Sequence, residues 1–337
     1  MTPKKRFQKA MGLRNPDRPP VLCPNQTATL EQMEKIGVYF PEAHKEADKM
    51  ARLAAAAWEQ LGLEAVGVPF CQSVEAEALG CEVAWGDKKT DIPHVPSQGI
   101  ATPDGIVVSE NFLEKGRIPA VLRAVETLKE EYGDVIPVLG HVIGPFSLAA
   151  HLANMRKILV SIHKNPELVR EFTRIGIDAI ADYGNAMLEH GADAIVIENM
   201  FASVDMIGGE SYAKFAAPFD EELIKKIKGD TILHVCGNGD KIIEDMIATG
   251  ATGISIDSRT NAEKAVIAAK GKAAILGNVD TVKVLTFGTP KGVREDTLRA
   301  LKAGVDIVAP GCALSPLTPS ENIIEMVKTV KHGEQKY

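Results

Sequence analysis

The amino-acid sequence predicts an α/β fold, a (β/α)₈ barrel of the TIM type. Eight short apolar segments with strand character recur along the 337 residues, and stretches with helical periodicity separate them. The expected strands are 20–24, 65–70, 135–141, 194–198, 231–234, 253–257, 273–277 and 306–310. An open doubly wound sheet is the alternative, but no Gly-x-Gly-x-x-Gly motif follows the first strand, so we favour the barrel.

Helical stretches fill the spaces between these strands. They are expected at 4–13, 41–61, 119–132, 148–162, 166–190, 211–228, 241–248, 261–269 and 292–303, with a last helix after Pro319. We expect one barrel domain over residues 1–337, with an N-terminal extension at 1–19 and an insertion at 71–116 after the second strand. Within the insertion, 80–85 and 106–109 have the character of two hairpin strands.

The composition is that of a soluble globular protein, with 45% apolar and 25% charged residues. A net charge of −7 argues against binding to nucleic acid or to an anionic membrane surface. The basic residues near the start are not followed by an apolar core of signal-peptide length, and no apolar run is long enough to span a membrane. The odd number of cysteines, five, favours a reducing cytoplasm over a disulfide framework.

A metal site is predicted in the stretch Thr231-Ile-Leu-His-Val-Cys-Gly-Asn238. His234 and Cys236 are two residues apart at a strand end, a spacing that directs an imidazole and a thiol to the same side. This pair suits Zn²⁺ but does not suffice to hold it, and Cys312 in the turn Ala309-Pro-Gly-Cys is the candidate third ligand. Because all strand ends of a barrel face one mouth, the three side chains can meet there.

Other polar residues also stand at the expected strand ends. Burying the carboxylate of Glu198 is costly without a partner, so we expect it to take the fourth metal position or to act as a general base. Asp257 and His141 are further catalytic candidates, although His141 could equally cap a turn. The candidates for cofactor binding are Asn199, Gly277 and Asn278. The other cysteines, Cys23, Cys71 and Cys81, are expected to be small core residues.

A zinc ion bound by one neutral imidazole and two thiolates carries roughly no net charge. Such a centre activates water poorly, but it can bind a thiol and lower its pKa, so that the thiol is held as a thiolate at neutral pH. The sulfur stays electron-rich and can attack a carbon centre such as a methyl group. The predicted ligand set therefore indicates a thiol-alkylating enzyme.

Several motifs resemble those of the uroporphyrinogen decarboxylase superfamily. They are His234-x-Cys236-Gly, Cys312 in Ala-Pro-Gly-Cys, Gly140-His-Val-Ile-Gly-Pro-Phe-Ser-Leu-Ala149 and Ser255-Ile-Asp257. The His-x-Cys pair with a distant cysteine is similar to its methylcobamide:coenzyme M methyltransferase branch, over nearly the whole chain. The resemblance implies a cytoplasmic barrel enzyme whose zinc ligands are His234, Cys236 and Cys312. It would move a methyl group from a small methylated corrinoid protein to the thiol of coenzyme M, in methanogenesis from methylated compounds.

Three alternatives stay open at this point. Uroporphyrinogen decarboxylase activity is disfavoured because the segment 20–28 has no arginine to bind substrate carboxylates. Methyl transfer to another acceptor, such as homocysteine or a folate, is a second alternative, because the metal motif does not identify the acceptor. A non-catalytic zinc- or corrinoid-binding protein would instead need a metal site closed by four protein ligands.

Overall fold

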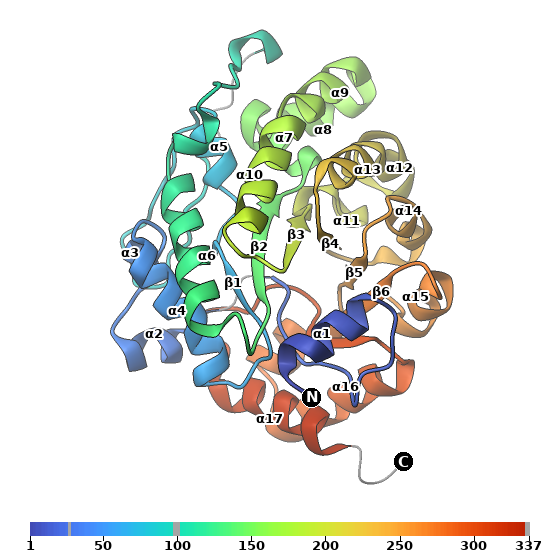
Figure 1. Ribbon diagram of the computed structural model, residues 1–337. Helices are drawn as coiled ribbons and strands as arrows, with labels where there is room; N and C mark the ends of the chain where they lie inside the picture. Colours follow the sequence, from blue (N-terminus) through green and yellow to red (C-terminus); the bar gives the residue numbers. More distant parts are fainter. Residues whose placement is uncertain (26–27, 97–101, 334–337) are drawn as a thin grey trace.

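The computed structural model describes residues 1–25, 28–96 and 102–333. Seven parallel strands lie in sequence order in one curled sheet, with helices around it (Figure 1). The strands are β1 (Val66–Val68), β2 (Val138–Ile143), β3 (Ala194–Glu198), β4 (Asp230–Val235), β5 (Gly253–Ile256), β6 (Ala274–Val279) and β7 (Ile307–Pro310). The predicted barrel architecture, with strands and helices in alternation, is confirmed.

The first expected strand, 20–24, is reduced to a single bridge. Val21 pairs in parallel with Val308 of β7, and Glu64, just before β1, donates its backbone N–H to the Val21 carbonyl over 2.7 Å. The segment therefore fills the eighth place in the barrel, between β7 and β1. Prolines at positions 20 and 24 explain why no longer strand forms, because proline has no N–H to donate to a ladder.

The helices are arranged around the outside of the sheet (Figure 1). The last helix before each strand and the helix after β7 are α4 (Ala47–Glu59), α6 (Ile118–Tyr132), α10 (Ile177–Glu189), α13 (Ala217–Lys226), α14 (Ile243–Ala248), α15 (Ala262–Ala269), α16 (Pro290–Ala303) and α17 (Ser320–His332). The other α-helices of the described residues are α1 (Pro3–Met11), α2 (Leu30–Ile36), α3 (Phe40–Ala43), α5 (Val74–Ala78), α7 (Pro145–Ala153), α8 (Met155–Lys164), α9 (Pro166–Ile175), α11 (Val204–Ile207) and α12 (Gly209–Phe215).

Several expected helices are interrupted. The stretches 41–61, 148–162, 166–190 and 211–228 each divide into two helices, and α2 was not predicted at all. Between α7 and α8 the break falls at Asn154, whose φ of 76° lies in the left-handed region and whose side chain caps α8. Between α9 and α10 it falls at Gly176, where a Cβ would lie 2.3 Å from a Leu148 methyl. A local cap thus marks the first break, and close packing explains why a glycine stands at the second.

In its described residues, 71–96 and 102–116, the insertion does not form the expected hairpin. Residues 74–78 near its start form α5, and Ala84 makes an isolated antiparallel bridge with His94 rather than with 106–109. Residues 106–109 form no strand, because no neighbouring strand covers them and Val107 is 78% exposed. Trp85 anchors the insertion: its ring lies 4.1 Å from Lys45 Nζ and 4.7 Å from the Arg117 guanidinium carbon. Part of the insertion, 97–101, lies outside the described residues.

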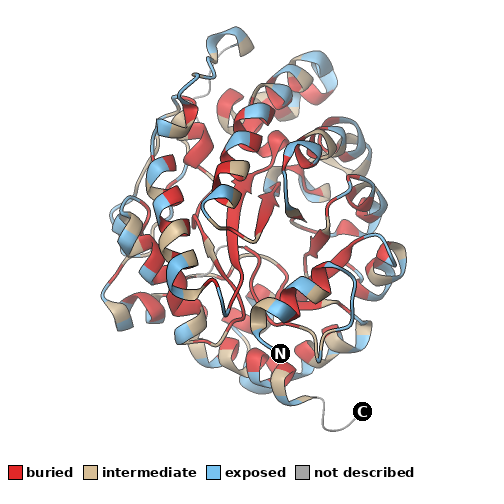
Figure 2. Ribbon diagram, viewed as in Figure 1, coloured by how far each residue is buried: buried red, intermediate tan, exposed pale blue. Residues whose placement is uncertain are grey.

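One end of the barrel is filled by apolar side chains and covered by α1. The interior cluster comprises Leu22, Ala65, Leu139, Ala194, Val196, Ile232, Ala274, Leu276 and Ile307, together with Phe7, Ala10 and Met11 of α1. Lys4 of α1 pairs with Asp193 just before β3 at 2.7 Å, so α1 lies across the amino ends of the strands. Figure 2 shows the strands and the inward helix faces as buried. The opposite end, where the carboxyl ends of the strands lie, is the mouth of the barrel, and functional residues are expected there.

None of the helices in the described ranges has the length and apolar character needed to cross a membrane.

Candidate metal centre

His234, Cys236 and Cys312 meet at the mouth of the barrel. His234 belongs to β4, Cys236 follows that strand directly, and Cys312 follows β7. The Cys236 Sγ atom lies 3.3 Å from His234 Nε2 and 3.6 Å from Cys312 Sγ, and the three ligand atoms all lie within 4.8 Å of one another. The structure thus brings together residues that lie up to 78 positions apart in the sequence.

The spacing of these atoms fits a tetrahedral zinc ion. With zinc–sulfur bonds of about 2.3 Å, two thiolate ligands lie about 3.8 Å apart, close to the separation of the two sulfurs here. The other ring nitrogen of His234, Nδ1, lies 3.1 Å from Ser255 Oγ, and this contact turns Nε2 toward the sulfurs. Metal-bound histidines are usually oriented by such a contact on the far side of the ring. The residues present therefore fit zinc in both spacing and chemistry.

The same three side chains perturb one another strongly. The hydrogen bond between the thiols raises the pKa of Cys236 and lowers that of Cys312 well below its ordinary value. Burial lowers the pKa of His234, but the hydrogen bond and charge of Cys312 outweigh burial, and the net effect is to raise it. A cation bound between these groups would compete with their protons.

Glu198 lies beside this cluster but is held by two amides. In the sheet it pairs with His234, and its side chain is 1% exposed. Asn25 Nδ2 donates to Glu198 Oε1 over 2.9 Å, and Gln72 Nε2 donates to Oε2 over 3.0 Å. Two amides thus help to satisfy this carboxylate, and its predicted role in the fourth metal position or as a general base stays a prediction. Among the described residues, the group of close metal-ligating atoms comprises the histidine and the two cysteines and does not include Glu198.

Asp257 and Asn278 both support the loop after β5. Asp257 accepts the backbone N–H of Gly237 at 2.8 Å and that of Arg259 at 2.9 Å. Asn278 donates to the carbonyl oxygens of Asp257 and Thr260, at 3.2 and 2.9 Å. Both side chains hold protein groups, and a catalytic role for Asp257 or a cofactor contact by Asn278 stays a prediction.

Gly277 and Asn199 both lie in closely packed parts of the interior. A Cβ on Gly277 would lie 2.7 Å from Ile256 Cγ1, so this glycine lets β5 and β6 approach. Asn199 is fully buried, accepts from the Ser147 hydroxyl at 2.8 Å and donates to Asp220 at 2.8 Å. Burial raises the pKa of Asp220 to about 7. Their predicted part in cofactor binding is untested, and Asp220 gave no sequence signal because it lies within a helix.

His141 lies on β2 inside the barrel and is 2% exposed. Its Nδ1 lies 2.8 Å from the Pro69 carbonyl oxygen and therefore donates to it, which leaves Nε2 as an acceptor. Within the described part of the chain, Nε2 has no hydrogen-bond partner. The ring packs on Gly67, where a Cβ would lie 2.6 Å from Nε2. His141 is thus a buried acceptor below the mouth.

Two residues of the site were missed by sequence reasoning, namely Asn25 and Gln72. Each follows an expected strand by one or two residues. The signal that could have found them is the same one used for the other candidates, namely a polar residue at the carboxyl end of a barrel strand. Cys23 and Cys71 are buried as expected, and Cys81 is half-buried. Cys71 is more than a core residue, because Arg117 Nη1 and Ser73 Oγ donate to its sulfur at 3.3 and 3.4 Å.

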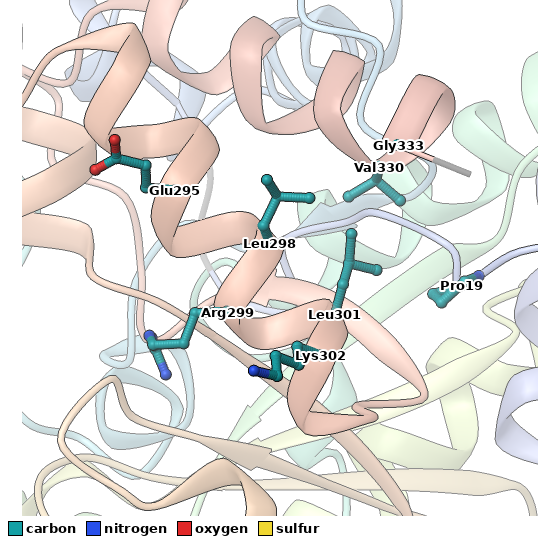
Figure 3. A pocket seen from close by; sticks show the side chains of 8 residues that line it. All are labelled: Pro19, Glu295, Leu298, Arg299, Leu301, Lys302, Val330 and Gly333. Carbon is teal, nitrogen blue, oxygen red and sulfur yellow. The ribbon is translucent and has the colours of Figure 1, made fainter. Parts of the chain in front are cut away.

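A cavity of about 960 Å³ lies away from this centre (Figure 3). Its walls come from α16 and α17, together with Pro19. It opens beside Leu298, Leu301 and Val330 and contains none of the predicted ligands among its described lining residues. The cluster of His234, Cys236 and Cys312 therefore does not belong to this cavity.

Comparison with known proteins places the chain in a family. Residues 2–333 match the uroporphyrinogen decarboxylase (URO-D) family. The chain belongs to this family. It is 39% identical over 335 residues to the methylcobamide:CoM methyltransferase MtbA of Methanosarcina acetivorans, covering 98% of each chain. It is 35% identical over 332 residues to MtaA, a methylcobamide:CoM methyltransferase of Methanosarcina barkeri, covering 97% of this chain and 96% of that one.

A solved structure described as a methyltransferase from Methanosarcina mazei superposes with a TM-score of 0.95 at 33% identity, and 99% of each chain is covered. The predicted family branch and the prediction of a methyltransferase are both confirmed by these likenesses. This URO-D family enzyme therefore combines a methyltransferase lineage with a cluster of one imidazole and two thiols at the barrel mouth.

Proposed function

We propose that the enzyme transfers a methyl group from a methylated corrinoid protein to the thiol of coenzyme M, with zinc held by His234, Cys236 and Cys312. The observation that carries the proposal is the convergence of these three side chains at the barrel mouth, at distances suited to one tetrahedral ion. The names of the relatives, methylcobamide:CoM methyltransferases, support the donor and the acceptor. The proposed setting is methanogenesis from methylated compounds, with the methylcobamide supplied by the partner protein.

Zinc bound there would supply a Lewis acid that lowers the pKa of the acceptor thiol and keeps its sulfur nucleophilic. Side chains of the protein would position the ligands of this ion. Ser255 sets the orientation of the His234 ring, and Asp257 holds the turn that carries Cys236 by binding the next backbone N–H. These contacts act before substrate arrives, so little reorganisation is needed during the reaction.

Glu198 is proposed as the proton acceptor for the incoming thiol. It is a buried carboxylate whose neighbour in the sheet is His234. The amides of Asn25 and Gln72 occupy one direction on each of its oxygens, which favours this role over that of a permanent fourth ligand. His141 is proposed to line the space below, with Nε2 as its acceptor.

The test is methyl transfer from free methylcobalamin to coenzyme M, with homocysteine in a parallel reaction, followed through the corrinoid absorption spectrum. We expect transfer to coenzyme M to dominate. Transfer to homocysteine alone would assign the enzyme to another acceptor, and an inert protein with four protein ligands on its metal would make the site structural.

The metal assignment makes a separate prediction. We expect about one zinc per chain in the purified protein, and Cys236→Ala or Cys312→Ala should lose most of the zinc and the activity. Cys81→Ala is the matched control, because Cys81 is a half-buried cysteine in the insertion. Metal analysis of the three variants decides the matter: full zinc content in both ligand variants would show that the site is misassigned.

Binding of coenzyme M should release about one proton near neutral pH, because the thiol loses its proton when it becomes a metal ligand. Calorimetry in buffers of different ionisation enthalpy measures this release. No release at a pH well below the pKa of the free thiol would contradict the thiolate mechanism.

A further inference from the structure

We propose that the turn at 257–260, here called the β5 turn, is a wedge that sets the separation of the two metal-binding thiols. The inference rests on the proposed function in one respect, since it takes Cys236 and Cys312 as ligands of one metal ion. In the sheet, β5 and β6 lie between β4 and β7, so the two cysteines come from strands that are not neighbours. Some other part of the chain must therefore fix how far apart they lie.

On one side, the β5 turn binds the backbone that follows Cys236. Asp257 Oδ2 accepts the N–H of Gly237 at 2.8 Å. Thr260 Oγ1 accepts the N–H of Gly239 at 2.9 Å and donates to the Gly237 carbonyl at 3.3 Å. Three hydrogen bonds from two side chains thus hold the turn just after the first thiol.

On the other side, the β5 turn lies directly against the residue before Cys312. A Cβ on Gly311 would lie 2.4 Å from the backbone nitrogen of Ser258 and 3.1 Å from the carbonyl carbon of Asp257. Real Cβ atoms do not approach backbone atoms so closely, and backbone cannot move aside as the end of a flexible side chain can. Gly311 is therefore required by contact with the wedge, and its N–H is fixed in addition by the Val279 carbonyl at 2.8 Å.

The wedge is supported from behind by α16. Asn278 donates to the carbonyls of Asp257 and Thr260, the two ends of the turn. Arg299 of α16 then donates to Asn278 twice, at 3.3 Å to its side-chain oxygen and at 3.1 Å to its carbonyl. Support on three sides makes the β5 turn a rigid spacer, and the sulfur–sulfur distance of 3.6 Å follows from its width.

This arrangement gives Asp257, Thr260 and Gly311 a positioning role. None of them is a ligand, yet each acts on the turn that carries one. Groups that orient metal ligands typically contribute about 10–100-fold to metal affinity. The wedge should therefore be visible in metal binding itself, without any methyl transfer.

Gly311→Ala is the direct test. We expect zinc affinity, measured by competition with a chromophoric chelator, to fall by about 10–100-fold. In the cobalt(II)-substituted protein, the thiolate charge-transfer band should weaken or shift. Gly292→Ala is the matched control, because a Cβ there meets nothing closer than Thr289 Oγ1 at 3.7 Å, and it should bind both metals as the unchanged protein does.

A second pair of variants covers the case in which Gly311→Ala does not fold. Thr260→Val keeps the shape of the side chain but removes the hydrogen bonds to Gly237 and Gly239, so metal affinity should fall. Thr260→Ser keeps the hydroxyl and should restore most of it. Thermal unfolding without metal checks that all variants retain the fold.

The outcomes separate the two proposals. Tight metal binding by the unchanged protein together with equally tight binding by Gly311→Ala and Thr260→Val would overturn the wedge and leave the proposed function standing. An unchanged protein that binds no zinc would overturn the metal assignment, and the wedge with it. Loss in these two variants, with retention in Gly292→Ala and Thr260→Ser, would support the wedge.

Discussion

Glu198 illustrates how a single buried carboxylate is held beside the proposed zinc ligands. Its side chain is 1% exposed, and both oxygens accept N–H groups from amides on the loops after the first two strand positions. The two amides come from parts of the chain 173 and 126 residues away. The carboxylate is therefore fixed in direction before any ligand binds, as a group that receives a proton should be.

Replacing this residue separates its possible roles. Glu198→Gln keeps the shape and removes the charge, and whichever of the Asn25 and Gln72 amides faces the new NH₂ can turn over to accept from it. We expect zinc to stay bound by the other three residues, while methyl transfer slows by roughly tenfold or more because the proton acceptor is lost. Turnover should be measured across the neutral pH range with zinc content in parallel. Unchanged turnover would make Glu198 a structural carboxylate, and a protein without zinc would make it a permanent ligand.

At the scale of the element, α2 shows what a local motif can specify. The helix is closed at its start by a capping box, in which Thr29 Oγ1 accepts the N–H of Gln32 at 3.3 Å and Gln32 Oε1 accepts that of Thr29 at 2.9 Å. The helix packs on α4 and ends at Gly37, which has a φ of 67°. The spacing Thr-x-x-Gln is visible in the sequence and would have predicted this helix.

The capping box predicts a specific loss of stability. Thr29→Ala removes the side-chain acceptor from a residue that is fully buried, so the free energy of unfolding should fall by about 1 kcal/mol. Thr29→Ser retains the hydroxyl and should stay within a few tenths of the unchanged protein. Urea unfolding measures both variants. Equal stability of the alanine and serine variants would show that the cap does not contribute.

At the scale of the whole molecule, closure of the barrel depends on Glu64. This carboxylate accepts from Arg6 of α1 at 2.8 Å, from Arg18 at 2.7 Å and from the N–H of Val21 at 3.1 Å. It thus joins the helix that covers the barrel, the segment that fills the eighth strand position and the start of β1. The side chains of Glu64, Arg6 and Arg18 are 2%, 6% and 11% exposed, so their charges are little screened by water.

Removing this charge should destabilise the fold more than removing a surface charge. Glu64→Gln leaves two largely buried guanidinium groups without their shared anion, and we expect a loss of roughly 3 kcal/mol. Glu126→Gln is the control, since Glu126 and its partner Arg123 are 42% and 57% exposed and water screens their interaction, so its loss should change stability little. Denaturant unfolding compares the two variants, and similar losses in both would refute the closing role of Glu64.

The barrel class and the three candidate metal ligands could be predicted from the sequence alone. Apolar runs that alternate with helical periodicity are local patterns, and the position of His234 and Cys236 just at a strand end is local too. Once the barrel is accepted, its geometry brings all strand ends to one mouth, so Cys312 could be added without knowledge of distances. These inferences needed only the order of residues and the symmetry of the fold.

Tertiary structure alone decided the rest. The partners of Glu198, the contact of Gly311 with Ser258 and the closure by Val21 join residues that are far apart in sequence, and such contacts depend on how elements pack. The need for glycine at position 176 likewise comes from the approach of Leu148, which no helical periodicity encodes. Local patterns determine which residues can form an element or bind a metal, whereas packing determines where each element ends and which groups hold the ligands in place.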